Sequence, residues 1–241
     1  MQPVIGRRAS RHARGFTLLE MAVTVAIIGV VAAMVAFGFG RQKPRARLSG
    51  ATIELQALLH EARQNALATG RLTVVMVFPA FRATADLGRG RFVVYEDGAG
   101  TFFTAGAPVS FGAFVPTSES TGPQSRIVTD MDLSREVAVG PSDGQGAAAV
   151  MPAPYGRVPI TAACTFCGAD RGAIAFNSQG EASFYSGNGA PTNAPGGSIS
   201  LYNPSEATDP ALDTAATVLE IRTLAVVAAT GAVRVLKKES P

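Results

Sequence analysis

Apolar residues form one long run near the start of the chain. From Phe16 to Phe39 the sequence reads FTLLEMAVTVAIIGVVAAMVAFGF, which is 24 residues with Glu20 as the one charged side chain. At about 1.5 Å of rise per residue, a helix of this length spans roughly 36 Å, whereas the hydrocarbon core of a bilayer is about 30 Å thick. Because a lone segment in lipid must pair its backbone groups internally, we expect residues 16–39 to form a transmembrane helix.

A second helical pattern follows the apolar run. From Leu48 to Thr69, leucine and alanine recur at spacings of three and four. Gly70 stands at the usual place for a helix end, and Pro44 is expected to kink the helix. Residues 40–70 are therefore predicted to be the amphipathic, periplasmic half of one long helix. Its expected buried face consists of Leu48, Ala51, Leu55, Leu58, Leu59, Ala62 and Ala66.

After Gly70 the period of the pattern changes to that of strands. Short β-branched and aromatic runs, separated by Gly, Pro, Ala and Ser, predict a β-rich domain with loop insertions over residues 71–241. Asp97-Gly98 predicts a turn that pairs Arg91–Glu96 with Thr101–Thr104, and Thr230-Gly231 predicts the turn of a last hairpin. The predicted strands are Arg71–Pro79, Arg91–Glu96, Thr101–Thr104, Arg126–Thr129, Arg157–Thr161, Ala173–Asn177, Ala182–Tyr185, Ser198–Tyr202, Thr217–Ala228 and Ala232–Lys237; the longest predicted loops are Gly140–Pro154 and Ser186–Gly197.

These patterns together predict an α+β fold. A long N-terminal helix, transmembrane and then amphipathic, packs on a C-terminal and mostly antiparallel β domain. With the leader and anchor set aside, about 190 residues remain, which is enough for one domain with its own core.

Basic residues lie close to the apolar run. Arg7, Arg8, Arg11 and Arg14 precede it, and the first 15 residues contain no acidic residue. This bias keeps the N-terminus cytoplasmic and places the following domain in the periplasm. From Leu48 to the end, 13 basic and 17 acidic residues give a net charge of about −4. The excess positive charge is therefore next to the membrane and gives no support for nucleic-acid binding.

Glu20 is an unusual residue for a membrane helix. A carboxylate at mid-bilayer costs roughly 2.5–3.5 kcal/mol, and less near the interface, so it normally has a partner. Cleavage after Gly15 would create one, because the free amino group of Phe16 would lie four residues from Glu20, within one chain or between neighbouring chains. A plain signal anchor, in which Phe16 never becomes an N-terminus, is the alternative.

The sequence gives little support for catalysis or metal binding. His60 is the one histidine beyond the leader, and it is expected at the surface. No other histidine there could act as the base that activates a serine nucleophile. Cys164 and Cys167 are predicted to form a disulfide in the oxidising periplasm, with a redox motif as the alternative. The acidic residues Glu96-Asp97 and Asp130-x-Asp132 are interpreted as solvated turns rather than a Ca²⁺ site. We expect no metal, no cofactor and no enzymatic activity.

The segment Gly15-Phe16-Thr17-Leu18-Leu19-Glu20, after a short basic leader, resembles the class III leader of type IV pilins and type II secretion pseudopilins. The resemblance implies that a prepilin peptidase removes residues 1–15 and that Phe16 is then N-methylated. It also implies that Glu20 docks the subunit against the Phe16 amine of its neighbour.

Three further segments resemble the H-type minor pseudopilins of type II secretion and the FimT-type minor pilins. They are Ala62–Ala66 (ARQNA), Gly172–Gly180 (GAIAFNSQG) and the terminal hairpin with Thr230-Gly231. The stretches Ala105–Ser125 and Gly140–Asp170 fall outside this resemblance.

The resemblance implies a minor pseudopilin, a non-enzymatic filament subunit of a type II secretion system. Such a subunit is a single-pass protein of the bacterial inner membrane whose C-terminal domain is periplasmic, and it joins a periplasm-spanning filament. The implied partners are the prepilin peptidase, other pseudopilins or minor pilins, the inner-membrane assembly platform and membrane lipid.

The alternative is a FimT-type minor pilin that acts in pilus assembly or DNA uptake. DNA-capturing members carry Gly-Arg-x-Arg in the last hairpin, whereas Gly231-Ala-Val-Arg234 lacks the first arginine. Arg234, Lys237 and Lys238 are the candidate DNA contacts. Because phosphate contacts come mainly from Arg and Lys and the domain is acidic, DNA binding is not expected.

Overall fold

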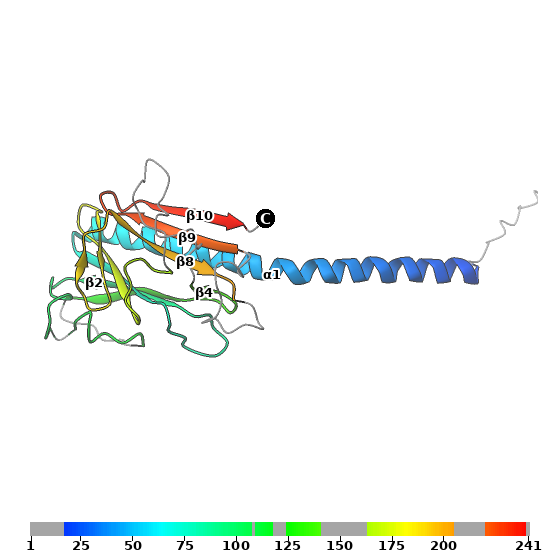
Figure 1. Ribbon diagram of the computed structural model, residues 1–241, viewed down its shortest axis with the longest axis horizontal. Coiled ribbons are helices and arrows are strands. Elements are labelled where there is room, and N and C mark those ends of the chain that lie inside the picture. The colour runs from blue at the N-terminus through cyan, green and yellow to red at the C-terminus, as the bar shows by residue number, and fades with distance from the viewer. Residues whose placement is uncertain (1–16, 108, 118–123, 141–162, 205–219, 240–241) are drawn as a thin grey trace, which may run out of the picture. The chain divides into compact units, whose positions relative to one another are not determined.

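The computed structural model describes residues 17–107, 109–117, 124–140, 163–204 and 220–239; the side chains of residues 35–44, 220 and 237–239 are also outside the description. It confirms the predicted α+β fold, in which helix α1 (Leu18–Thr69) is followed by antiparallel strands (Figure 1). The chain divides into two units, residues 1–43 and 44–241, and the boundary between them lies inside α1. The helix is continuous through Pro44, and the kink expected there stays a prediction.

The described strands of the second unit form two antiparallel sheets. Sheet A has the strand order β3-β2-β1-β5-β6-β7, and sheet B has the order β10-β9-β8-β4. Sheet A contains β1 (Leu72–Phe78), β2 (Arg91–Asp97), β3 (Arg126–Asp132), β5 (Gly172–Phe176), β6 (Ala182–Tyr185) and β7 (Pro191–Thr192). Sheet B contains β4 (Ala138–Val139), β8 (Gly196–Tyr202), β9 (Glu220–Val227) and β10 (Val233–Glu239).

Most of the predicted strands are present within a few residues of their expected bounds. The last hairpin is confirmed by the pairing of β9 with β10, in which Val226 lies opposite Val233. Arg157–Thr161 and the first residues of Thr217–Ala228 lie outside the described residues, as does most of the predicted loop Gly140–Pro154. The predicted loop Ser186–Gly197 is wrong in part, because it contains β7 and the start of β8.

The predicted pairing of Thr101–Thr104 with β2 is wrong. Strand β2 pairs with β1 on one side and with β3 on the other. The reason is the buried carboxylate of Asp97, which accepts hydrogen bonds from the backbone N–H groups of Gly100 and Phe102, both at 2.9 Å. These bonds fold the chain over β2, so that the Phe102 ring stacks on Tyr95 with centroids 4.6 Å apart.

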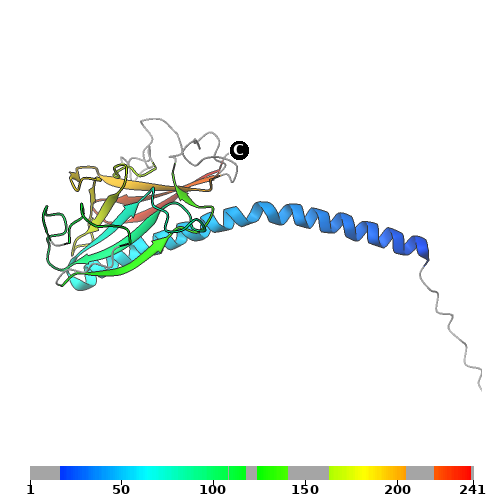
Figure 2. The same ribbon diagram turned by 90° about the horizontal axis from the view of Figure 1, so that it is seen from below.

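The core of the second unit confirms the predicted buried face of α1. All seven predicted residues are buried in one cluster, and His60 is exposed as expected. The same cluster contains Val75 and Phe92 of sheet A and Leu201 and Leu224 of sheet B. The second half of α1 therefore packs against both sheets (Figures 1 and 2).

The other face of sheet A is covered by the segment between β2 and β3. We call Phe102, Phe103, Phe111 and Phe114 of this segment the aromatic cover. Together with Tyr95 they form a second buried cluster over Val74, Met76 and Val93 of the sheet. Part of Ala105–Ser125, which fell outside the family resemblance, thus serves as a lid on the sheet.

Candidate functional site

The start of α1 is capped by a side chain. Thr17 is the first described residue, and its Oγ1 accepts a hydrogen bond from the backbone N–H of Glu20 at 3.2 Å. Its carbonyl oxygen accepts a second bond from the N–H of Met21 at 3.1 Å. Thr17 is therefore the N-cap of α1, with Glu20 at the third helical position, as in the Thr-x-x-Glu capping pattern. Gly15 and Phe16 lie outside the described residues, so the cleavage and methylation site stays a prediction.

The carboxylate of Glu20 lies in the first turn of α1. At this end of a helix the unpaired N–H groups and the helix dipole favour a negative charge, by about 0.3–1 kcal/mol when exposed. Between Thr17 and Met34, where side chains are described, Glu20 is the one ionisable residue, and it is exposed. Its negative charge is thus available to a cation that approaches the start of the helix.

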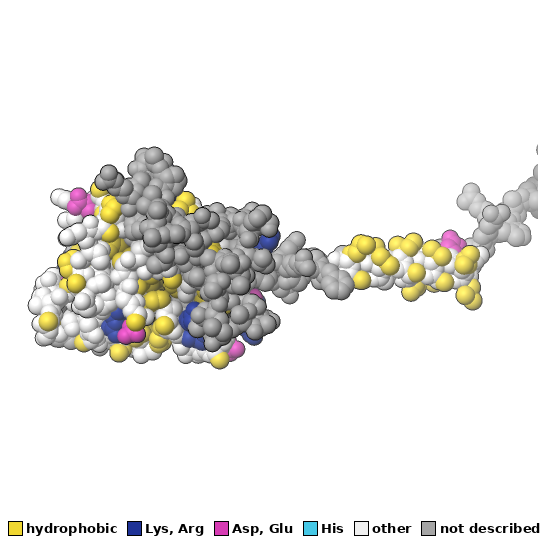
Figure 3. All heavy atoms as spheres, in the orientation of Figure 1, with side chains coloured by type: hydrophobic (Ala, Val, Ile, Leu, Met, Phe, Trp, Pro, Cys, Tyr) yellow, Lys and Arg dark blue, Asp and Glu magenta, His cyan; other side chains and the backbone are white. Residues whose placement is uncertain are grey.

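The described first unit is apolar on all sides of its helix. Leu18 is 88% exposed, Leu19 75% and Met34 71%, and Figure 3 shows the corresponding band of hydrophobic side chains. The hydroxyl of Thr24 donates to the carbonyl oxygen of Met21 at 2.9 Å, so it places little polarity on this surface. So much exposed apolar surface indicates a segment that is covered by lipid or by other protein.

Among the described residues, no helix has both the length and the hydropathy that a membrane span requires.

The three segments that carry the resemblance to minor pseudopilins meet around Arg63. Arg63 Nε donates to the carbonyl oxygen of Gly180, at 3.2 Å, in the turn between β5 and β6. Its side chain also lies against Gly231 in the turn between β9 and β10, where an added Cβ would come within 3.1 Å of Arg63 Cδ. Helix α1, sheet A and sheet B are therefore joined at one arginine.

The structure describes the side chain of only one of the three candidate DNA contacts. Arg234 lies exposed on β10, opposite Ala225 of β9. Lys237 and Lys238 belong to β10 by their backbone, and their side chains are outside the description. Their role as DNA contacts stays untested.

Cys164 and Cys167 form a disulfide, as predicted. The loop that they close is attached to β8: Cys164 forms a β-bridge with Ile199, and Thr165 exchanges two hydrogen bonds with Ser198, of 3.0 and 2.8 Å. The predicted role of this disulfide in stapling a long insertion stays a prediction, because residues 141–162 lie outside the described residues.

Glu96 was expected in a solvated turn, and this interpretation is wrong. Glu96 is 2% exposed, and its carboxylate pairs with Arg71 at 2.9 Å and with Arg126 at 3.1 Å; the Asn65 amide of α1 donates to it at 3.1 Å. Burial alone would raise the pKa of Glu96, but the hydrogen bonds from Asn65, Arg71 and Arg126 and the charge of Arg126 outweigh it and lower the pKa below its usual 4.5. Glu96, which lies on β2, thus links this strand to α1, to Arg71 before β1 and to β3, and has a structural role.

Asp130 and Asp132 also lie in a strand rather than in a turn. Both are on β3, and each pairs with the guanidinium of Arg91 at 2.6 Å. Because Arg91 occupies their oxygens, these carboxylates are not arranged for Ca²⁺. Within the described ranges, no group of three or more His, Cys, Asp or Glu could hold a metal ion.

The aromatic cover is fixed by a cation that the sequence patterns did not reveal. Arg171 Nη1 donates to the carbonyl oxygens of Phe111 (3.0 Å), Gly112 (3.2 Å) and Phe114 (2.7 Å), and its guanidinium lies 5.6 Å from the Phe78 ring centroid. Local sequence patterns cannot predict these hydrogen bonds, because Arg171 and its acceptors are 57 to 60 residues apart in the sequence.

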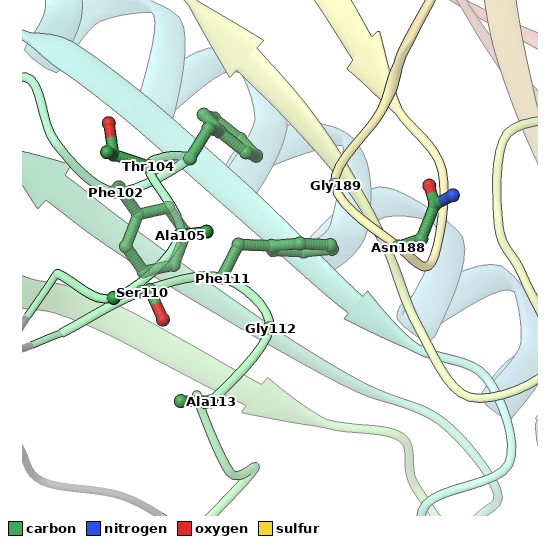
Figure 4. Close-up of a pocket in the computed structure, with 11 residues that line it drawn as sticks. Phe102, Thr104, Ala105, Ser110, Phe111, Gly112, Ala113, Asn188 and Gly189 are labelled. Carbon is green, nitrogen blue, oxygen red and sulfur yellow. The ribbon is translucent and has the colours of Figure 1, made fainter.

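A pocket of about 240 Å³ opens between the aromatic cover and the turn after β6. In Figure 4 the Phe111 ring points toward the turn that carries Asn188 and Gly189. The walls contain no charged side chain among the residues that line it. The polar side chains that line it, Thr104, Ser110 and Asn188, include no histidine or carboxylate that could act as a general base.

Comparison with known proteins identifies the N-terminal segment. Residues 10–36 match a family described as the prokaryotic N-terminal methylation motif. No curated protein and no solved structure matches the chain. The motif supports a type IV pilin-like protein that is membrane-anchored, is processed by a prepilin peptidase and assembles with other pilins. It indicates a structural filament subunit rather than an enzyme.

Proposed function

We propose that the chain is a minor pseudopilin of the H type, a filament subunit of a type II secretion system. The observation that carries this proposal is the start of α1. A threonine-capped helix with a single carboxylate in its first turn and an apolar surface begins two residues after the predicted cleavage site, inside the methylation motif. Such a helix fits a subunit that moves from lipid into a filament core.

The cap explains how processing would prepare the subunit for assembly. Hydrolysis of the bond between Gly15 and Phe16 leaves an ammonium group on the residue directly before the N-cap. N-methylation of this amine removes one N–H donor and keeps the positive charge. Glu20 then offers its negative charge, the only one on the described residues 17–34, to the ammonium group of a neighbouring subunit, where a shared apolar environment strengthens the attraction.

The remainder of the proposal concerns location and subtype. Residues 16–39 anchor the subunit in the inner membrane, and residues 40–241 lie in the periplasm, where the disulfide is chemically stable. The junction at Arg63, which unites the three segments shared with H-type and FimT-type subunits, supports this subfamily. The acidic balance from Leu48 onward and the missing arginine after Gly231 favour secretion over DNA uptake.

The N-terminus of the mature protein tests the first step. Intact-mass and N-terminal peptide spectra of the chain, purified from cells with an active prepilin peptidase, are expected to show methylated Phe16 as the first residue. Cells that lack the peptidase supply the matched control and retain residues 1–15. A chain that keeps its leader in both strains, or that is cut elsewhere, contradicts the proposal.

Glu20 tests the assembly step. In Glu20→Ala the apolar helix is retained, so membrane insertion and processing are expected to continue. Incorporation into filaments, measured by cross-linking to the major subunit, is expected to fall by an order of magnitude or more. Glu20→Asp, which keeps the charge on a shorter stem, is the control and recovers part of the incorporation. Equal incorporation of Glu20→Ala and the unmodified chain removes Glu20 from the mechanism.

A further inference from the structure

Residues 164–171 connect two parts of the second unit that are distant in sequence, strand β8 and the aromatic cover, and we call this segment the clasp. Its first part lies along β8 through the bridge between Cys164 and Ile199. Its last residue, Arg171, holds the carbonyl oxygens of the aromatic cover. The disulfide lies between these two attachments.

The first part of the clasp is tightly enclosed. Phe166 is 3% exposed and packs against Phe184 of β6, with ring centroids 5.3 Å apart. A Cβ added at Gly197 of β8 would come within 2.6 Å of both rings, so only glycine lets the strand approach them this closely. On the other side, a Cβ at Gly172 would lie 2.8 Å from Cys167 Sγ. The disulfide is therefore in direct contact with the start of β5.

A short turn, residues 168–171, links the disulfide to Arg171. The N–H of Gly168, next to Cys167, donates to the carbonyl oxygen of Arg171 at 2.8 Å. A Cβ on Gly168 would meet the backbone of Gly187 at 3.1 Å, so the turn is also held from the β6–β7 side. The backbone of Arg171 is thus fixed on both sides of the position from which its side chain reaches the cover.

The segment that carries the aromatic cover depends on this single side chain for three carbonyl groups, those of Phe111, Gly112 and Phe114. Buried or partly buried carbonyls that lose their donors carry a desolvation cost, so an Arg171 that is displaced leaves the loop without its attachment. Phe111 and Gly112, two of the residues that Arg171 holds, also line the pocket of Figure 4.

We propose that the clasp is a redox-sensitive device: the Cys164–Cys167 disulfide fixes Arg171, and its reduction releases the aromatic cover together with the pocket wall that the cover segment forms. The covalent link restricts the backbone between the two cysteines, and its loss returns conformational freedom to residues 164–168. The device gives this domain two states, an ordered cover under oxidising conditions and a mobile cover when a dithiol reductant has acted.

The chemistry of the switch is a two-electron reduction. A dithiol attacks one sulfur of the disulfide, the S–S bond breaks through a mixed disulfide, and the reductant leaves as its own disulfide while both cysteines become thiols. In vitro, a phosphine serves the same purpose: it becomes the phosphine oxide with oxygen from water, and the two protons of water are taken up by the cysteine thiolates.

Hydrogen exchange on the full mature chain in detergent micelles tests the proposal. The N–H groups of Phe111 and Phe114 are hydrogen-bonded to the carbonyl oxygens of Phe102 and Ser110, so peptides over residues 102–114 report directly on the cover. Reduction by tris(2-carboxyethyl)phosphine is expected to raise exchange in these peptides about tenfold or more. Exchange in β1 is expected to change less than twofold.

Variants separate the two attachments. Oxidised Arg171→Ala is expected to show the same rise over residues 102–114, and reduction of this variant adds little, because the cover is already released. Arg171→Lys, whose ammonium group can donate to the same carbonyls, is expected to restore part of the protection. Exposed Arg82→Ala serves as the matched surface control, and the Cys164→Ser, Cys167→Ser double variant shows that the reductant acts through these cysteines.

Two results would overturn the proposal. In the first, reduction loosens residues 163–168 while residues 102–114 keep their protection, which means that the disulfide and the cover are independent. In the second, exchange rises by the same factor in β1 as in the cover, which means that the disulfide stabilises the whole domain and has no selective effect.

Discussion

Arg63 Nε donates to the carbonyl oxygen of Gly180 at 3.2 Å, which joins α1 to the β5–β6 turn of sheet A. The same side chain lies against Gly231 in the hairpin of sheet B. Because the backbone N–H of Ala182 also donates to the carbonyl oxygen of Ala228 at 2.8 Å, the two sheets are linked directly beside this arginine. The helix and both sheets thus share one fixed point near the end of α1.

Gly231→Ala is expected to destabilise the second unit by about 2–5 kcal/mol, from the strain of the left-handed backbone and the steric clash together. Gly231 has φ +61°, and a Cβ there would lie 2.2 Å from the carbonyl oxygen of Gly180. Urea unfolding of the mature chain in micelles, followed by the near-ultraviolet circular dichroism of buried Tyr95 and Tyr202, measures the effect.

Gly70→Ala is the control for this prediction. Gly70 ends α1 with a similar φ of +69°, but an added Cβ would meet nothing within 4 Å. Its expected cost is therefore the strain alone, about 1–2 kcal/mol. Equal costs for the two variants would show that the contact between the two turns contributes nothing to stability.

The spacing of hydrophobic residues along the chain was sufficient to predict those helices and strands whose buried positions recur regularly. The seven apolar positions of α1 are all buried, and the strands of sheet A other than β7 begin and end within a few residues of their predicted bounds. The predictions that failed share one cause: in each case a side chain binds backbone groups of an irregular or distant segment, and no hydrophobic period reports such a contact. Asp97 turns Thr101–Thr104 away from β2, and Arg171 holds a cover that no period describes. Strand β4 is two residues long, too short for any alternation.

Some residues of the candidate site could be predicted from the sequence, and others could not. Glu20 was found because it is the exception in an apolar run, and a helix cap at Thr17 could have been found from the Thr-x-x-Glu spacing. Arg63 carries no such signal, since its importance depends on two turns that are 117 or more positions away. The paired state of Glu96 was missed for the same reason, because its partners come from α1, from Arg71 just before β1, and from β3.

Thr17→Val is expected to lower filament incorporation about threefold to tenfold while processing at Gly15 continues. The substitution keeps the shape of the side chain and removes the oxygen that accepts from the N–H of Glu20, which costs a helix start about 1 kcal/mol and frays the turn that carries the carboxylate. Cross-linking to the major subunit measures incorporation. Thr17→Ser, which retains the hydroxyl, is expected to behave like the unmodified chain, and identical behaviour of the two variants would contradict a role for the cap.

The mature chain is expected to bind DNA weakly and without a steep dependence on salt. From Leu48 onward the chain is acidic, and of the three candidate contacts the structure describes only the side chain of Arg234, exposed on β10. Gel-shift titrations at about 50 and 200 mM salt measure the slope, which grows by about 0.9 for each phosphate neutralised. Tight binding at the lower salt concentration that is lost in the Arg234→Ala, Lys237→Ala double variant would instead favour the DNA-uptake alternative.

Glu96→Gln is expected to change how stability depends on pH. The pKa of Glu96 is lowered in the folded protein, so between that pKa and the usual 4.5 the unfolded chain binds more protons than the folded chain. The stability contributed by the ionised group is therefore complete above about pH 5 and is lost as the pH falls through 4.5 and below. Since the side chains of Arg71 and Arg126 are 44% and 61% exposed, solvent screens the pairs, and the expected loss at pH 7 is about 1–3 kcal/mol.

Urea unfolding of both proteins from pH 3 to pH 7 should show their stabilities converging at the acid end. Glu61→Gln, at an exposed position of α1, is expected to leave the profile unchanged, and a constant difference between Glu96→Gln and the unmodified chain over the whole range would contradict the assignment of the effect to ionised Glu96.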